Sequence, residues 1–297
     1  MTGATGAKER PELRAGFVGL GKIGGPMARR LLAAGLPTWV HDAVPAALEP
    51  LVAAGAKAAA SPRALAAEAD VVGVCVRDDD DVRDVLLGEE GLLAGAAPGS
   101  VIAVHSTVLP RTVRGLGEAA AARGVGLVDA CITGGPVGAQ QGTLVTMVGG
   151  EPGHVERCGP FFAAFSAKVV ATGPLGTGAA VKLCNNLMTY LGFLAAFEAT
   201  LLADRAGLSR DAFEAVTRGN GNLTDTMRAF LGLHRAPAEQ RRSEPFQALL
   251  RSYTELAEKD LAVTLAFARE HGVALPGAAL AQQTMARVYG LEDEGRR

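Results

Sequence analysis

The sequence has few aromatic residues and almost no net charge. Aromatic side chains make up 5% of the 297 residues, and the formal net charge is −2 at pH 7. A chain this close to neutral has no general attraction to nucleic acid or to an anionic membrane surface, so we expect neither as a partner. Apolar residues still make up 48% of the chain, enough for a sizeable core in one large or two ordinary domains.

The sequence also lacks Cys-x-x-Cys pairs, the apolar segment of a signal peptide and a long uninterrupted apolar run. Residues 1–13 are polar and are expected to form a disordered tail. Residues 181–202 come nearest to a membrane span but carry Lys182, two asparagines and Glu198, so we expect a buried helix there. We expect buried free thiols in a reducing, cytoplasmic compartment. The cysteines are Cys75, Cys131, Cys158 and Cys184.

Short β-branched runs alternate with Ala- and Leu-rich stretches through the first half of the chain. Such alternation predicts an α/β fold with a parallel, doubly wound sheet. Continuous apolar runs, of which residues 71–76 are the strongest, are typical of strands buried on both faces. The predicted strands include residues 17–18, 38–41, 71–76, 101–104, 127–128, 144–148 and 168–171.

The alternation stops near Gly173 and Pro174, and the pattern beyond is helical. We therefore predict two domains, an α/β domain over residues 14–174 and an all-helical domain over residues 175–297. The predicted helices cover residues 181–206, 211–217, 246–268 and 278–289, with loops at 219–222 and 237–245.

A glycine-rich loop follows the first predicted strand and opens a helix. It reads Gly19-Leu20-Gly21-Lys22-Ile23-Gly24, the G-x-G-x-x-G pattern that cradles a pyrophosphate at a helix N-terminus. Asp42 follows the second strand, where a carboxylate binds ribose hydroxyls and repels a 2′-phosphate. The pattern predicts a nicotinamide dinucleotide, NAD rather than NADP. The alternatives are a helix cap at Asp42 and a purely structural turn at the loop.

A polar cluster lies on the apolar helix predicted after Gly176. Lys182, Asn185 and Asn186 share one helical face, and burying such groups is costly unless each has a partner. Hydride transfer from an alcohol needs a base for the hydroxyl proton. A lysine can serve if burial or a nearby cation lowers its pKa from about 10.4. The alternative is a lysine that extends to solvent beside capping amides.

A second glycine-rich segment, residues 129–136, lies at the carboxyl end of a predicted strand and contains Thr133-Gly134-Gly135. Ligands bind at this edge of open α/β sheets, and a hydroxyl followed by glycine amides makes an anion pocket. A substrate carboxylate is the expected guest, and an ordinary turn is the alternative. Ser106 and Thr107 follow another strand and, taken alone, indicate a helix cap.

Together these segments resemble the β-hydroxyacid dehydrogenase family, which includes 3-hydroxyisobutyrate dehydrogenase and tartronate semialdehyde reductase. The resemblance spans roughly residues 14–290. It implies a Rossmann-type domain followed by a helical domain like that of 6-phosphogluconate dehydrogenase, with the active site in the cleft between them. It also implies a homodimer or homotetramer formed through the helical domains.

The resemblance further implies roles for individual residues. Lys182 matches the catalytic lysine, Asn186 a substrate-binding asparagine supported by Asn185, and Thr133-Gly134-Gly135 the substrate-carboxylate loop. The cofactor-binding set comprises the residues of the first glycine loop together with Asp42, Val76, Arg77, Thr107 and Lys259. Asp260 is expected to anchor Lys259.

The chain departs from the family pattern in several places. Thr133 stands where the family usually has Ser, and Val76-Arg77 where it has Leu-Pro. Ala179 replaces a commonly polar residue. Residues 218–253 match poorly, and most of their polar side chains are expected to be surface or capping groups. These side chains are Asn220, Asn222, Thr224, Arg228 and His234.

We therefore expect an NAD(P)-dependent oxidoreductase, NAD-preferring and without a metal, that interconverts a small 3-hydroxy acid and its semialdehyde or keto acid. One alternative is an imine reductase of the same fold, although those enzymes usually lack the lysine. A less favoured alternative is a non-catalytic nucleotide-binding protein. The chain is too short for the larger helical domain of a decarboxylating sugar-phosphate dehydrogenase.

Overall fold

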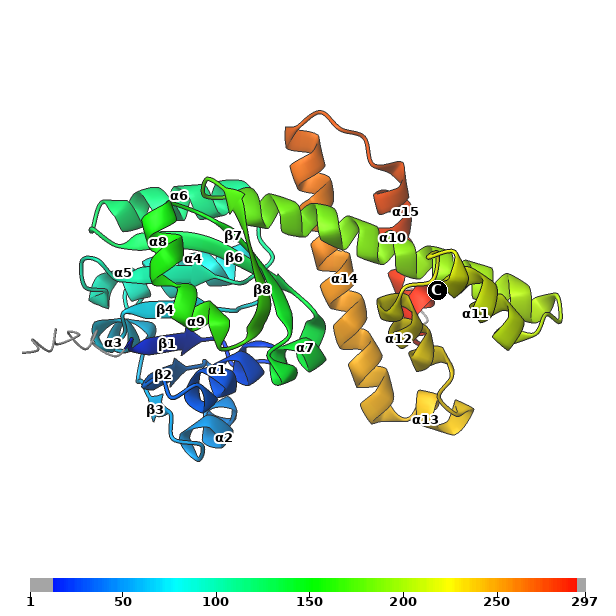
Figure 1. The fold of residues 1–297 in the computed structure, drawn as a ribbon, viewed down its shortest axis with the longest axis horizontal. Coiled ribbons are helices and arrows are strands. Elements are labelled where there is room, and N and C mark those ends of the chain that lie inside the picture. The colour runs from blue at the N-terminus through cyan, green and yellow to red at the C-terminus, as the bar shows by residue number, and fades with distance from the viewer. Residues whose placement is uncertain (1–12, 293–297) are drawn as a thin grey trace, which may run out of the picture. The chain divides into compact units, whose positions relative to one another are not determined.

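The computed structural model describes residues 13–292 and divides into two compact units (Figure 1). The first unit extends to Lys182 and contains the sheet, and the second begins at Leu183 and is helical. We call them the sheet unit and the helical unit. Of the predicted tail, residues 1–12 lie outside the described residues.

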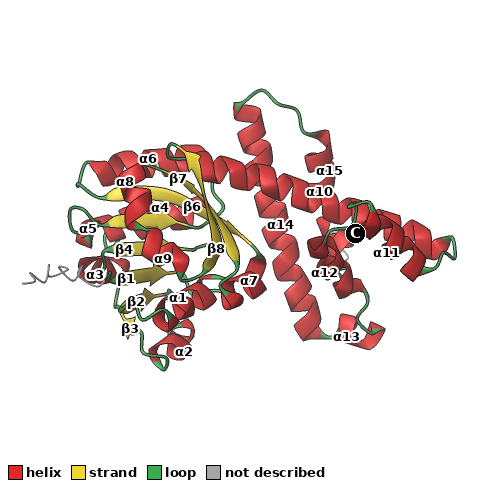
Figure 2. Ribbon diagram, in the orientation of Figure 1, coloured by secondary structure: helices red, strands yellow, loops and turns green. Residues whose placement is uncertain are grey.

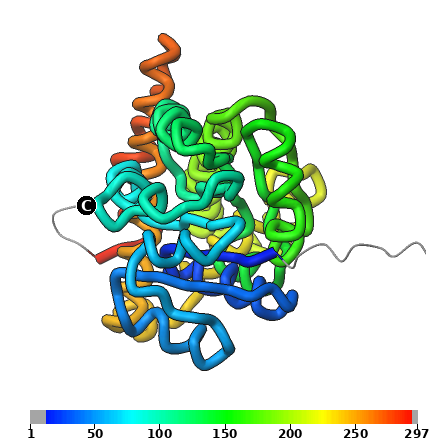
Figure 3. The backbone as a smooth tube through the Cα atoms, turned by 90° about the vertical axis from the view of Figure 1, so that its left-hand side faces the viewer, coloured from blue at the N-terminus to red at the C-terminus, as the bar shows by residue number. Residues whose placement is uncertain are grey.

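The sheet unit is built on one eight-stranded sheet with the order β3-β2-β1-β4-β5-β6-β7-β8. Figure 3 shows the blue β1–β3 segment at one end of this unit and later, green segments at the other. The strands are β1 (Ala15–Val18), β2 (Thr38–His41), β3 (Lys57–Ala58), β4 (Val71–Val74), β5 (Val101–Val104), β6 (Gly126–Thr133), β7 (Leu144–Gly149) and β8 (Ser166–Gly173).

Helices cover both faces of this sheet (Figure 2). Successive strand residues enter different cores, since Val71 packs with Phe17 and Phe161 while Val72 packs with Leu65. The predicted burial on both faces is therefore confirmed for residues 71–74, whereas β3 and β8 are largely exposed. The helices are α1 (Gly24–Ala33), η1 (Pro45–Ala47), α2 (Glu49–Val52), α3 (Pro62–Glu68), α4 (Asp79–Leu87), α5 (Leu92–Gly95), α6 (Pro110–Ala121), α7 (Gly135–Gln141), α8 (Pro152–Arg157) and α9 (Gly159–Ala163).

The register brings the carboxyl ends of the central strands to one level. Val18 pairs with Val74, Val74 pairs with Val104, and Val104 pairs with Asp129. Because β6 continues to Thr133, its last residues extend beyond the ends of its neighbours. This edge is where ligands bind in open α/β sheets.

One strand pair differs from the predicted parallel sheet. β6 and β7 are antiparallel, whereas the other neighbouring pairs are parallel. The physical reason is the short connection between these strands, which holds little besides α7. A parallel crossover needs a longer connection that returns the chain to the other end of the sheet.

The helical unit contains no strand among its described residues, as the sequence predicts. The prediction of a loop at residues 237–245 is wrong, and α12 was not predicted. Pro237 is the N-cap of α13 and Pro245 lies in the first turn of α14, positions at which proline permits a helix. The helices are α10 (Thr177–Arg205), α11 (Arg210–Gly219), α12 (Asp225–His234), α13 (Ala238–Arg242), α14 (Glu244–Glu270) and α15 (Pro276–Tyr289).

The long helix α10 is less buried than its composition predicts. Its buried side chains follow helical spacing along one face and include Leu183, Tyr190 and Phe193. The opposite face exposes Met188 by 77% and Leu202 by 72%. By length and composition alone, α10 could cross a membrane. Because only 22% of its most apolar window is buried, the prediction of a buried helix is corrected to a partly exposed one.

The cysteine prediction is also corrected in part. Cys131 and Cys158 are buried, Cys75 is half-buried and Cys184 is exposed. No disulfide forms among residues 13–292, which include all four cysteines. Cys184 is exposed because it lies off the helical stripe of buried residues on α10 that includes Leu183, Asn186 and Tyr190.

Candidate active site

The first glycine loop has the geometry of a phosphate-binding turn. Gly19 adopts a φ of +88°, and a Cβ there would lie 2.3 Å from Cys75 O. A Cβ on Gly24 would lie 1.9 Å from Gly19 O, so both positions require glycine. A Cβ on Gly21 would meet nothing within 4 Å, which leaves that side of the loop open to a ligand. Ile23, the N-cap of α1, makes no side-chain capping bond to the first-turn amides.

Asp42 holds this loop at the end of β2. Its Oδ2 accepts a hydrogen bond from Leu20 N at 2.6 Å, and its Oδ1 accepts one from Val44 N at 2.8 Å. The bond to Val44 N fits the capping role considered for Asp42, whereas the bond to Leu20 N was not predicted. Each carboxylate oxygen can accept further bonds, so Asp42 retains the capacity to bind ribose hydroxyls. That role remains a prediction.

Arg77 has a partner that was not predicted from the sequence. Its Nε lies 2.8 Å from Asp81 Oδ2, and its side chain is 84% exposed. The hydrogen bond between them holds the pKa of Asp81 below its ordinary value and raises the pKa of Arg77. The i,i+4 spacing of an arginine and an acid was the available signal. Nearby, Ser106 Oγ accepts from Val76 N at 2.9 Å and ties the end of β4 to β5.

The structure brings Lys182 to the carboxyl end of β6. Lys182 Nζ donates a hydrogen bond to Ile132 O at 2.7 Å, and the side chain is half-buried. The next residues are Thr133, which ends β6, and Gly134 and Gly135, with φ values of +126° and +65°. A Cβ on Gly135 would meet nothing within 4 Å. The predicted base and the predicted carboxylate loop are therefore neighbours.

Asp129, the first residue of the second glycine-rich segment, belongs to the site but had no predicted role. It is fully buried in β6, and its Oδ1 accepts from Gly176 N at 2.8 Å while its Oδ2 accepts from Ala179 N at 2.6 Å. Burial raises the pKa of Asp129 and outweighs the effect of these amide donors. The available signal was an acid inside an otherwise apolar strand.

The helical unit contains a second polar cluster, centred on Asp260. Its Oδ2 accepts from Asn186 Nδ2 at 2.7 Å and from Tyr190 Oη at 3.0 Å, and Lys259 Nζ lies 2.7 Å from its Oδ1. Asp260 therefore contacts Lys259, as expected, and also holds Asn186. Tyr190, which lies one turn beyond Asn186 on α10, was not predicted as a site residue. Asn185 bonds through its backbone oxygen to Thr189 Oγ1 at 3.0 Å.

Burial strongly affects the Tyr190 hydroxyl. Burial first, and then the neighbouring Asp260, raise the pKa of Tyr190 well above its ordinary value. Tyr190 therefore remains a neutral donor to the carboxylate over the physiological pH range.

The polar residues of the divergent segment 218–253 have structural partners. Thr224 caps α12 by accepting from Met227 N at 3.2 Å, and His234 Nε2 bonds to Val288 O at 2.8 Å. Arg228 pairs with Glu214 at 3.5 Å. Asn220 Oδ1 accepts from the backbone N of Asn222 at 3.1 Å. Thr224, Arg228 and Asn220 thus have the expected capping and surface roles, whereas His234 is half-buried and its ring packs against Phe197 and Phe230.

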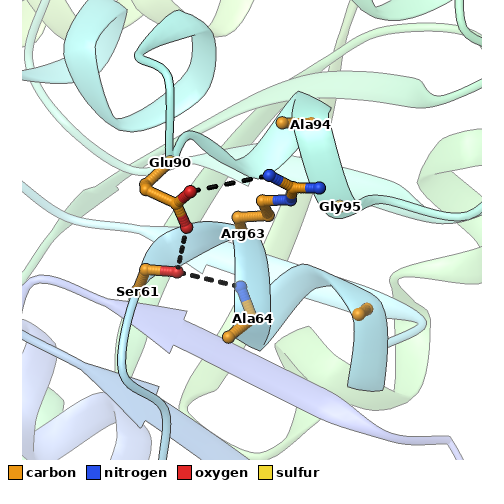
Figure 4. Close-up of a pocket in the computed structure, with 7 residues that line it drawn as sticks. Ser61, Arg63, Ala64, Glu90, Ala94 and Gly95 are labelled. Atoms are coloured by element: carbon orange, nitrogen blue, oxygen red, sulfur yellow. Dashed lines mark hydrogen bonds and ion pairs between the residues drawn. The ribbon is translucent and has the colours of Figure 1, made fainter.

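A separate surface cavity of about 390 Å³ lies in the sheet unit between α3 and α5 (Figure 4). Its charged groups bond to each other: Ser61 Oγ donates to Glu90 Oε2 at 2.9 Å, and Arg63 lies 3.5 Å from Glu90 Oε1. None of the predicted site residues lines it. Its polar side chains pair with each other and are more than half exposed at Arg63 and Glu90, so we assign no catalytic role to this cavity.

Two family models match the chain. Residues 14–173 match the NAD binding domain of 6-phosphogluconate dehydrogenase. Residues 176–296 match the domain described as NAD-binding of NADP-dependent 3-hydroxyisobutyrate dehydrogenase. The two matches meet near the predicted domain boundary, whereas the compact units divide after Lys182.

Curated relatives resemble nearly the whole chain. The NAD-dependent L-serine dehydrogenase of Pseudomonas aeruginosa is 35% identical, with 89% of this chain and 88% of the relative covered. The 3-hydroxyisobutyrate dehydrogenase of the same organism is 34% identical, with 90% and 89% covered.

Solved structures agree with these relatives. The 3-hydroxyisobutyrate dehydrogenase of Salmonella typhimurium has a TM-score of 0.78 and 29% identity, and the alignment covers 93% of each chain. An imine reductase from Pseudomonas sp. has a TM-score of 0.64 at 18% identity, with 94% of this chain and 95% of that chain covered, and shows a shared fold alone. The chain therefore belongs to the β-hydroxyacid dehydrogenase family of NAD(P)-dependent oxidoreductases.

Proposed function

We propose that this protein interconverts a small 3-hydroxy acid and its semialdehyde or keto acid with NAD, using Lys182 as the general acid and base. The observation that carries the proposal is the 2.7 Å bond from Lys182 Nζ to Ile132 O, directly before Thr133-Gly134-Gly135. It puts a proton-transfer group beside a loop suited to a carboxylate. Relatives named as L-serine and 3-hydroxyisobutyrate dehydrogenases support this substrate class.

The residues of the sheet unit fit a nicotinamide dinucleotide. The open side of Gly21 and the uncapped start of α1 suit a pyrophosphate, and Asp42 suits a ribose without a 2′-phosphate. When bound, the nicotinamide supplies the hydride acceptor for oxidation and the donor for reduction. Thr107 and Lys259 complete the proposed cofactor contacts, with Asp260 holding Lys259.

The proposed proton transfer uses residues of β6 and α10. The Thr133 hydroxyl and the amides after Gly134 bind the substrate carboxylate, which fixes the distance from the carboxylate to the reacting carbon. Lys182 Nζ accepts the substrate hydroxyl proton during oxidation and returns it during reduction. Asn186, held by Asp260, donates to the substrate oxygen.

We also propose that the protein is a cytoplasmic homodimer or homotetramer. Support comes from the apolar side chains that α10 exposes, among them Val181 at 42% and Met188 at 77%. Isolated apolar side chains are normal on a surface, but a row along one helix face is typical of an interface. Sedimentation velocity would test this, since a monomeric Met188→Glu variant is expected if that face is buried between copies.

The proposed function is tested by NADH and NADPH formation with a panel of 3-hydroxy acids that includes L-serine and 3-hydroxyisobutyrate. We expect turnover with NAD, and a loss of about 100- to 10,000-fold in Lys182→Ala with NADH binding retained. Lys168→Ala is the matched control, since Lys168 is exposed on β8. Equal loss of turnover and NADH binding in Lys182→Ala would contradict the role of the lysine. Turnover of a cyclic imine without hydroxy-acid activity would contradict the substrate class.

A further inference from the structure

The buried carboxylate of Asp129 connects β6 to the first turn of α10. It receives hydrogen bonds from Gly176 N and Ala179 N, one on each oxygen. Both donors are backbone amides at the start of the helix that carries Lys182. A buried carboxylate at this position therefore fixes the helix backbone itself, not one of its side chains.

Glycines around Asp129 let the helix and strand approach closely. A Cβ on Gly149 would lie 2.5 Å from Asp129 Oδ1, and a Cβ on Gly178 would lie 3.0 Å from Oδ2 and 2.6 Å from Met147 O. Neither glycine has the positive φ that would by itself require glycine. Their small size therefore serves the contact with the carboxylate and the strand, not a backbone conformation.

The two contacts between β6 and α10 keep the same spacing along the chain. Asp129 meets Ala179, and three residues further along each element Ile132 meets Lys182. Three strand residues span about 10 Å, whereas three helical residues rise about 4.5 Å. The Lys182 side chain, whose Nζ bonds to Ile132 O, bridges the two elements at this second contact. The Asp129 contact thus determines how far along β6 the ammonium group reaches.

Stability does not explain an ionised carboxylate at this position. Burial raises the pKa of Asp129, which means that the fold disfavours its ionised form relative to water. At neutral pH ionisation of Asp129 therefore costs stability relative to the neutral carboxyl, whereas removal of the side chain would leave both amides without their acceptor. The position of α10 accounts for the carboxylate of Asp129, whereas its effect on stability does not.

We propose that Asp129 is a positioning residue that, with Gly149 and Gly178, sets the place of Lys182 Nζ beside the substrate-carboxylate loop. This inference rests on the proposed role of Lys182 in proton transfer. A loss of the Asp129 contact displaces the ammonium group while leaving the nucleotide loop at the end of β1 in place. The expected effect is therefore on kcat and not on cofactor binding.

Asp129→Asn tests the proposal. The amide keeps one acceptor oxygen but turns a donor toward a backbone N–H, so one of the two bonds is lost. We expect kcat to fall about 10- to 100-fold, because a displacement of about 1 Å can cost about 100-fold. NADH affinity and the KM of the substrate should stay within about twofold, since the groups proposed to bind them remain. Asp70→Asn, which alters a half-buried carboxylate just before β4 that also accepts from a backbone amide, Arg14 N, is the control and should leave kcat unchanged.

A double-variant cycle separates positioning from a general structural defect. If Asp129 acts through Lys182, Asp129→Asn should lower the residual rate of Lys182→Ala by less than about twofold. If Asp129→Asn instead causes a general structural defect, the fold-losses in rate of the two single variants should multiply in the double variant. Equal losses in both backgrounds would overturn the proposal.

Gly178→Ala keeps the test decisive if Asp129→Asn does not fold. Its added methyl pushes the first turn of α10 away from β6 and should lower kcat with the same dependence on Lys182. Gly115→Ala is its control, because a Cβ on Gly115 in α6 meets nothing within 4 Å. If Lys182→Ala is fully active, the proposed function fails. If Lys182→Ala is inactive but neither Asp129→Asn nor Gly178→Ala lowers kcat, this inference alone fails.

Discussion

The sheet unit and the helical unit each bury a carboxylate that bonds to α10, but the groups that bind it differ. Asp129 in the sheet unit accepts from two backbone amides. Asp260 in the helical unit accepts from the side chains of Asn186 and Tyr190 and pairs with Lys259. Both are nearly inaccessible to solvent.

This difference separates two ways of placing functional groups. Backbone donors are present whatever the side chain, so the Asp129 contact depends on the size of the neighbouring residues and fixes the helix position. Side-chain donors vary with each substitution, so the Asp260 cluster depends on the identity of three residues and fixes the direction of Asn186. Removing either carboxylate leaves its partners unsatisfied, and the penalty depends on their charge.

The largest effect on stability is expected for Asp260→Ala. This change leaves two buried side-chain donors and one ammonium without their acceptor, and we expect the free energy of unfolding to fall by about 3–5 kcal/mol. Urea denaturation measures it. Asp225→Ala is the control, because that side chain is 90% exposed, and should change stability by less than about 1 kcal/mol. An equal effect for both variants would remove the distinction between a buried cluster and a surface acid.

A somewhat smaller effect on stability is expected from His105, a buried residue of the sheet unit. Only one of its ring nitrogens bonds to the backbone. Its Nδ1 bonds to Ala130 O at 2.6 Å, and its Nε2 has no partner among the described residues. Burial lowers the pKa of His105 from 6.5 to about 4. Between these values the unfolded chain binds the proton and the folded protein does not, so stability falls as the pH falls.

The expected loss between pH 7 and pH 4 from this histidine is roughly 3 kcal/mol, from the pKa difference. Unfolding by urea at several pH values measures it. His105→Leu should lack this part of the pH dependence, and His271→Ala, at an exposed position, should keep it. If the free energy of unfolding depends on pH in the same way in His105→Leu and in the parent protein, His105 does not contribute to that dependence. The backbone contact at Nδ1 would then suffice to keep its titration normal.

Much of the sheet unit was predictable because its signals are local. Apolar β-branched runs predicted β2 and β5 to the residue, and the glycine loop is identified by spacing alone. Asp129 and Asp260 were harder, because each contact joins residues far apart in the sequence. A sequence pattern shows that a buried acid needs a partner but not which amide or side chain supplies it.

The helical unit was less predictable for a related reason. Proline at Pro237 and Pro245 is compatible with both a loop and a helix start, and here the second is realised. The exposure of Met188 and Leu202 also could not be predicted, because apolar composition does not distinguish packing within a chain from packing against another copy.

Asp42 extends the comparison to a carboxylate that is bonded to backbone and also faces a proposed ligand. In Asp42→Ser the bonds to Leu20 N and Val44 N weaken, so the affinity for both dinucleotides should fall. The charge that repels a 2′-phosphate is also lost, so we expect the NAD-to-NADP ratio of kcat/KM to fall by about 10- to 100-fold. Asp78→Ser, which removes a capping acid of α4, is the control. An unchanged ratio would limit Asp42 to holding the loop.

The smallest effect is expected for Tyr190→Phe, which tests how far the Asp260 cluster depends on each donor. The change removes the hydroxyl that donates to Asp260 Oδ2 at 3.0 Å and keeps the ring that packs against Phe193. Asn186 still donates a hydrogen bond to the Asp260 carboxylate, and Lys259 still neutralises its charge. We therefore expect a loss of about 1 kcal/mol in the free energy of unfolding. Phe193→Leu, which changes the same packing without touching Asp260, is the control. Because Asn186 would lose one neighbour that fixes its acceptor, the KM of the substrate should rise in Tyr190→Phe but not in the control. A loss as large as that of Asp260→Ala would mean that the cluster acts as a single unit, and that its side-chain donors are as indispensable as the backbone amides around Asp129.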